Sequence, residues 1–135
     1  MPATTKRWTA QEVRDLTSES RPWPRYEVID GKLLVTPAPR RAHQRAVTLL
    51  WRLLEDHARA QRIGRAEISP ADIELEPDSI VQPDIFVVPA EQSGPACEWK
   101  DVTRLILAVE ILSPSSARFD RVTKRAFYAR TGVPE

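Results

Sequence analysis

The sequence predicts an α/β fold of the α+β kind, in which helices pack on a mixed β-sheet. Segments with apolar residues at helical spacing alternate with short runs rich in β-branched residues, in the order helix, two strands, helix, three strands, helix. The nearly continuous apolar run LILAVEIL is typical of a strand that is buried on both faces. With 135 residues, 41% of them hydrophobic and 29% charged, the chain is expected to form one globular domain, residues 1–135.

The first half of the chain predicts a helix, a hairpin and a second helix. Thr9 and Glu12 have the spacing of a capping box, so a short helix should run to about Ser18. RYEVIDGKLLVTP predicts a hairpin around Asp30-Gly31, a dipeptide that favours tight turns. A long helix is expected from Arg41 to about Arg62, ended by Gly64. Its apolar residues recur at helical spacing and form one stripe: Val47, Leu50, Trp51, Leu54 and Ala58.

The second half predicts three strands and a last helix. AEISPADIEL and SIVQPDIFVVP should be neighbouring strands, followed by a loop from about Pro89 to Asp101. RLILAVEIL is the third strand, and SPSS turns the chain into a helix from about Ala117 to Thr131. The buried face of that helix is expected to be Val122, Ala126 and Ala129.

Composition narrows the classes of function. The net charge of +1 gives no global basic signature, so binding to nucleic acid would need a local basic face. A single cysteine, Cys97, excludes an intramolecular disulfide and a cysteine-based zinc site. We find no apolar signal-peptide core and no run long enough to span a membrane, so we expect a cytoplasmic, bacterial protein.

Two carboxylates stand out against their apolar surroundings. Glu110 interrupts the buried strand, where an ionised carboxylate is costly unless it is paired or bound to a metal. Asp84 opens an apolar strand in PDIF, and it can meet Glu110 if the two strands are neighbours. A divalent cation, Mg²⁺ or Mn²⁺, would remove the repulsion between them and could activate water. The alternative is that an arginine neutralises Glu110 and Asp84 merely caps a strand.

Three further residues are candidates for the same site. Lys124 lies near one edge of the buried face of the last helix, where a cation could orient water or steady a phosphate, or could simply snorkel to solvent. Glu27 shares a face with Ile29, so it can point inward or remain a surface glutamate. His43 falls in line with the buried stripe and can be a structural residue. Three other polar residues of the long helix are expected to be solvated: Glu55, Asp56 and His57.

Four blocks in this order resemble the Uma-two family, whose members are described as restriction endonucleases with a fold of the PD-(D/E)XK nuclease type. The blocks are RYEVIDGKLLVTPAPRRAH, VQPDIFVVP, AVEILSPSS and DRVTKRAFYARTGVPE, and the resemblance covers about residues 8 to 135. It implies that Asp84 and Glu110 are metal ligands, with the backbone carbonyl of Ile111 as a further ligand. The lysine expected two residues after Glu110 is Leu112 here, and Lys124 on the following helix matches the position that replaces it.

The resemblance also implies that Glu27 and His43 line the same pocket. The family continues past GVPE into a further strand of the YWIVDP kind, so we expect the domain to be truncated at its C-terminus.

Two functional hypotheses follow, and a third is compatible with both. The first is a Mg²⁺-dependent endonuclease, with DNA as the expected substrate and 5′-phosphate products, in which arginines of the two long helices meet backbone phosphates. The second is a catalytically inactive nuclease-fold module that acts in nucleic-acid or protein interaction. The third is a homodimer that uses exposed strands or the region of Trp8 and Trp23.

Overall fold

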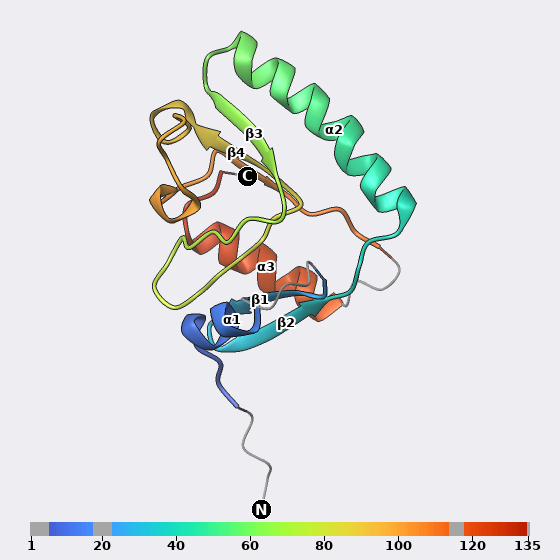
Figure 1. Cartoon of the computed structure of the whole chain (residues 1–135), viewed down its shortest axis with the longest axis vertical. Coiled ribbons are helices and arrows are strands. Elements are labelled where there is room, and N and C mark those ends of the chain that lie inside the picture. The colour runs from blue at the N-terminus through green and yellow to red at the C-terminus, as the bar shows by residue number, and fades with distance from the viewer. Residues whose placement is uncertain (1–5, 18–22, 114–117, 135) are drawn as a thin grey trace, which may run out of the picture.

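A computed structural model gives the fold of the chain and describes residues 6–17, 23–113 and 118–134 (Figure 1). The element order is the expected one. The helices are α1 (Ala10–Thr17), α2 (Arg41–Ala60) and α3 (Arg118–Arg130), and the strands are β1 (Arg25–Ile29), β2 (Lys32–Thr36), β3 (Gly64–Ile68), β4 (Ile85–Pro89) and β5 (Leu107–Val109). The loop between β4 and β5 contains two short 3₁₀ helices, η1 (Ala90–Gln92) and η2 (Trp99–Asp101).

The strands of the described residues form two small antiparallel sheets rather than one mixed sheet. β1 pairs with β2, and the second sheet has the order β3-β4-β5. Val28 and Ile80 join the hairpin to the chain before β4 through two backbone hydrogen bonds, 2.9 and 2.8 Å long. The predicted α+β class is therefore confirmed, while the expected mixed pairing is replaced by purely antiparallel pairing.

The N-terminal predictions are confirmed in detail. The backbone amide of Thr9 donates to Glu12 Oε1 and the amide of Glu12 donates to Thr9 Oγ1, both at 3.2 Å, which completes the capping box of α1. The expected end of this helix at Ser18 lies outside the described residues. Asp30 and Gly31 have φ angles of 48° and 77°, as a two-residue turn of type I′ requires.

The C-terminal part of the predicted apolar stripe of α2 packs on the three-stranded sheet, as expected. Trp51, Leu54 and Ala58 lie against Ala66 and Val87, and the indole of Trp51 donates to the carbonyl of Ala66 at 2.8 Å. In Figure 1 the helix runs along the outer side of β3.

Two expectations about α2 are wrong. Glu55 is buried rather than solvated, because its carboxylate accepts a hydrogen bond of 2.9 Å from Arg65 on the adjacent strand. Gly64 does not end the helix: α2 ends at Ala60, and Arg62 takes the left-handed conformation (φ 55°) that closes it. Gly64 instead begins β3, where a Cβ atom would lie only 1.9 Å from the carbonyl oxygen of Val88.

The C-terminal elements also depart from expectation. Strand β5 is only three residues long and half-buried, because it lies at the edge of its sheet among the described residues. On α3, Phe127 is fully buried, whereas Val122 is 61% exposed and Ala126 and Ala129 are exposed. A large aromatic ring buries more apolar surface than an alanine, so Phe127 sets which face turns inward.

One core ties together the elements that carry the polar site. Ile29 of β1, Phe86 of β4 and Phe127 of α3 pack in the same cluster of buried residues. Figure 1 shows α3 between the hairpin and the strands β3 and β4. None of the described helices has the length and apolarity that a membrane span requires.

The close approach of Gly64 to β4 gives a first prediction. Gly64→Ala should lower the free energy of unfolding by about 3 kcal/mol or more, because the new methyl group meets backbone rather than a side chain that can move. Gly94→Ala is the matched control, since nothing lies within 4 Å of a Cβ there, and it should change stability by less than about 1 kcal/mol. Urea unfolding measures both, and equal stability of the two variants would contradict the close approach.

Candidate functional site

The structure brings all five predicted site residues together. Asp84 immediately precedes β4 and Glu110 immediately follows β5, and the register Ile85↔Val109 places these two positions opposite each other. Glu27 comes from β1, His43 from the first turn of α2 and Lys124 from the second turn of α3. The expectation that Asp84 and Glu110 lie at the same end of neighbouring strands is met, through an antiparallel pair.

Lys124 joins two carboxylates from different strands. Its Nζ lies 2.7 Å from Glu110 Oε1 and 2.8 Å from Glu27 Oε2. The Glu27 side chain is only 1% exposed, and its Oε2 also accepts a hydrogen bond of 2.7 Å from the backbone amide of Gln82. Burial alone would lower the pKa of Lys124, but the two carboxylates outweigh it and raise the pKa above its usual value. The side chain is therefore a protonated ammonium at neutral pH.

Glu110 is the carboxylate whose ionisation is most strongly altered. Burial raises its pKa to about 7, with Lys124 acting in the opposite direction and the charges of Glu27 and Asp84 adding to the increase. The hydroxyl of Tyr128 donates to the same Oε1 atom at 2.7 Å. Burial and the charge of Glu110 raise the pKa of Tyr128 well above its usual value, so the phenol keeps its proton and remains a donor. Glu110 is thus close to its titration midpoint at neutral pH.

Asp84 is held by three neighbours. Its Oδ2 accepts a hydrogen bond of 2.7 Å from the backbone amide of Ile111, and its Oδ1 accepts one of 3.1 Å from Arg25. His43 Nε2 lies 3.3 Å from Oδ2, while His43 Nδ1 is buried without a hydrogen-bond partner. The Ile111 amide therefore links the end of β5 directly to Asp84. The alternative prediction was an arginine that neutralises Glu110. In the structure the arginine, Arg25, pairs with Asp84, and Glu110 pairs with Lys124.

Arg25 and Tyr128 also belong to the site, although neither was among the residues predicted from the sequence. Both could have been found from spacing, since Arg25 alternates with Glu27 on the same face of β1 and Tyr128 lies one helical turn after Lys124. The guanidinium of Arg25 is 5.5 Å from the centre of the Trp23 ring, which provides a further favourable contact for a buried cation.

The donor set has the chemistry that a small divalent cation needs. Mg²⁺ commonly binds to one or two protein carboxylates and keeps several waters, and Asp84 and Glu110 supply two carboxylates at adjoining strand ends. Within residues 6–17, 23–113 and 118–134, no group of three or more histidine, cysteine or acidic side chains is arranged to hold an ion. The site therefore fits a cation held by two carboxylates and water, but not one enclosed by protein ligands.

Comparisons with known proteins concern the family model that the chain matches and its fold. Residues 10–135 match the family model described as "Uma2: Putative restriction endonuclease". A solved structure of a putative nuclease of the DUF820 family from Anabaena variabilis has a TM-score of 0.65 and 22% sequence identity to this chain, and the match covers 86% of this chain and 65% of that one. No curated protein matches. The fold is therefore that of a restriction-endonuclease-like protein, and the chain spans 65% of the length of this neighbour.

The shared ion pair of Lys124 gives a second prediction. Lys124→Met leaves Glu27 and Glu110 facing each other without a cation, so stability should fall by about 3–5 kcal/mol near pH 8. The pKa of Glu110 then rises further above its unfolded value. Its contribution to stability is present at low pH and lost as the pH rises, so the loss should be smaller near pH 5.

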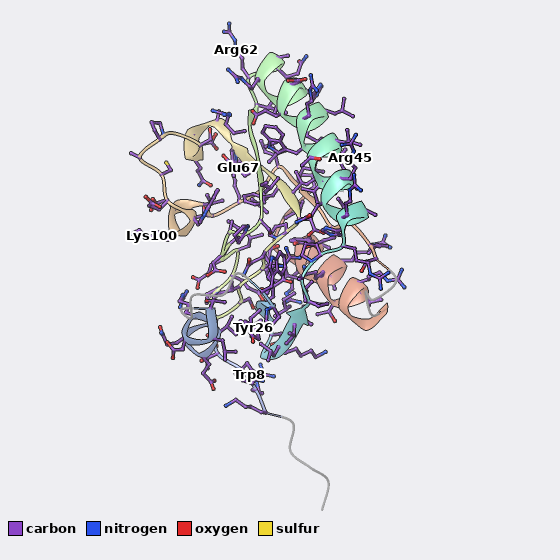
Figure 2. All side chains as sticks on the ribbon, turned by 45° about the vertical axis from the view of Figure 1, so that its right-hand side comes forward. Trp8, Tyr26, Arg45, Arg62, Glu67 and Lys100 are labelled. Atoms are coloured by element: carbon purple, nitrogen blue, oxygen red, sulfur yellow. The ribbon has the colours of Figure 1, made fainter. Side chains whose placement is uncertain are left out.

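The matched control is Lys100→Met, which removes an exposed lysine on η2 and should change stability by less than about 0.5 kcal/mol at either pH. Figure 2 shows Lys100 far from the region where α3 and the hairpin meet. Chemical unfolding at both pH values measures the effect. A Lys124→Met protein with the same stability deficit at both pH values would contradict the arrangement.

Proposed function

The chain belongs to the Uma2 family, and on that premise we propose that it is a metal-dependent endonuclease that hydrolyses phosphodiester bonds of nucleic acid, with DNA as the substrate. The observation that carries the proposal is the joining of Asp84 and Glu110 at paired strand ends, with Lys124 on the second carboxylate. Two acidic side chains can hold a metal ion that activates water and offsets charge on a phosphate, and a nearby lysine adds a positive charge.

Asp84 and Glu110 would hold Mg²⁺ or Mn²⁺. When bound there, such an ion lowers the pKa of a coordinated water and offsets negative charge on the phosphate. Glu110 must be ionised to serve as a ligand, and its pKa of about 7 means that binding near neutral pH releases part of a proton. The proposed activity should therefore increase from about pH 6 to pH 8.

Lys124 acts as a positive charge and hydrogen-bond donor rather than as a base. Its raised pKa keeps the ammonium protonated, so it can orient an attacking water or stabilise charge that develops on the phosphate. Glu27 positions Lys124, because its ion pair with Nζ holds the ammonium between Glu27 on β1 and Glu110 after β5. Tyr128 positions Glu110 through its hydroxyl.

A second candidate function is nucleic-acid or protein binding without catalysis. One observation favours it: Arg25 already pairs with Asp84 and Lys124 with Glu110, so each of these carboxylates has a protein cation beside it. Under this reading the carboxylates stabilise the fold. The expected homodimer and the expected cytoplasmic location remain predictions that this structure does not test.

Cleavage of supercoiled plasmid and of a structured RNA, with Mg²⁺ or Mn²⁺ and with a chelator, tests the proposal. We expect cation-dependent nicking of the plasmid that falls by about 100-fold or more in Asp84→Asn and in Glu110→Gln. Glu91→Gln, which removes an exposed carboxylate paired with Arg104, is the matched control and should cut normally. Circular dichroism confirms that each variant is folded. A folded wild-type chain that binds nucleic acid but cuts neither substrate with either ion would favour the binding module instead.

A further inference from the structure

The arginines of the described chain fall into two groups. Those outside α2 and its ends are mostly paired with carboxylates: Arg7 with Asp30, Arg14 with Glu74, Arg25 with Asp84, Arg65 with Glu55, Arg104 with Glu91 and Arg130 with Glu76. The arginines of α2 and the residues flanking it have no carboxylate partner among the described residues: Arg40, Arg41, Arg45, Arg52, Arg59 and Arg62. The composition of the chain cannot explain this difference, because both groups belong to the same sequence.

Four of these unpaired arginines form one row along the helix, which we call the arginine row: Arg41, Arg45, Arg52 and Arg59. At about 100° per residue they fall within an arc of about 40°, and at 1.5 Å per residue they extend over about 27 Å. All four are exposed, on the side of α2 turned away from Trp51 and Ala58. Figure 2 shows Arg45 on the outer side of α2 and Arg62 beyond its C-terminal end.

The helix does little to balance these charges. Glu55, one of its two acidic residues, is turned inward to Arg65, which leaves Asp56 as the acidic side chain on the outer side. Like charges spaced along one face repel one another and destabilise an isolated helix. A polymer with regularly spaced negative charges would remove that repulsion. Each strand of a DNA duplex carries a phosphate about every 3.4 Å along the duplex axis, so the row is as long as about eight base pairs.

The N-terminal end of α2 extends this surface toward the carboxylates. The N-cap Arg40 makes no side-chain cap hydrogen bond and the first turn has no acidic residue, so the first amides and the positive end of the helix dipole are available to an anion. His43, two residues after Arg41, lies 3.3 Å from Asp84. Since Arg41 and His43 are on different sides of the helix, a bound strand reaches the carboxylates by passing around this end.

We propose that the arginine row and the N-terminal end of α2 form the surface along which a nucleic-acid backbone binds and is led to Asp84 and Glu110. The destination of the strand rests on the proposed nuclease function, whereas the binding itself does not. The surface contacts phosphates, so it confers affinity without sequence specificity.

Fluorescence anisotropy with a labelled DNA duplex of about 20 base pairs, without divalent cations, tests the row. The variant carries Arg41→Gln, Arg52→Gln and Arg59→Gln. The matched control carries Arg7→Gln, Arg14→Gln and Arg104→Gln, which remove the same charge from exposed paired positions. Affinities are compared between about 50 and 200 mM salt.

We expect the row variant to bind more than about tenfold more weakly than the control, and its plot of log affinity against log salt to be shallower by about 3. The control should retain the wild-type salt dependence within about 1. Equal binding by the two variants would overturn the proposal. So would a row variant that binds DNA normally but changes its sedimentation coefficient, because the face would then be a contact between copies of the chain.

Binding and cleavage measured on the same preparations of the wild type and the row variant separate this proposal from the proposed catalysis. If the wild type cuts nothing but binds through the row, the surface stands and the nuclease function falls. If cleavage persists in the row variant with unchanged binding, the nuclease function stands and the surface falls.

Discussion

The structure of the polar site depends on one ammonium group shared between two buried carboxylates. Lys124 on α3 contacts Glu27 on β1 and Glu110 after β5, so three elements that are distant in the sequence are held at one point. Removing one charge from this set of three leaves the remaining charges buried and unpaired. This costs more stability than the complete set contributes to the fold. Phe127, three residues after Lys124, packs in the core that the same elements share. Apolar packing and the shared ion pair therefore specify the same placement of α3.

This arrangement also links the stability of the fold to the proposed chemistry. The proposed chemistry requires carboxylates that repel one another to lie close together, and in this chain Arg25 pairs with Asp84 and Lys124 with Glu110. The repulsion is not fully balanced, since burial and the neighbouring charges leave the pKa of Glu110 at about 7. When a carboxyl group has its titration midpoint near neutral pH, a further cation nearby favours the ionised form. The same excess of negative charge that costs stability is what would draw a metal ion to this end of the strands.

The sequence was informative wherever a local pattern determines the structure. The capping box at Thr9, the turn at Asp30-Gly31 and the meeting of Asp84 with Glu110 follow from spacing and strand pairing, and all are present. The buried face of α3 was predicted wrongly. The helical spacing of alanine and valine is a weak signal when an aromatic residue of the same helix buries more apolar surface. Glu55 and Gly64 were misjudged for a related reason: their partners, Arg65 and the carbonyl of Val88, come from other elements, and no local pattern reveals them.

The most direct test of the central interaction is the pKa of Glu110 in the folded protein, followed by ¹³C NMR of the side-chain carboxyl carbons of labelled glutamate. Glu110→Gln identifies the signal by its disappearance. A buried carboxylate that shares Lys124 with Glu27 should titrate near pH 7, well above the usual pKa of a glutamate. A Glu110 signal that titrates in the ordinary range for glutamate, about pH 4 to 5, would contradict a buried cluster in which carboxylates outnumber cations.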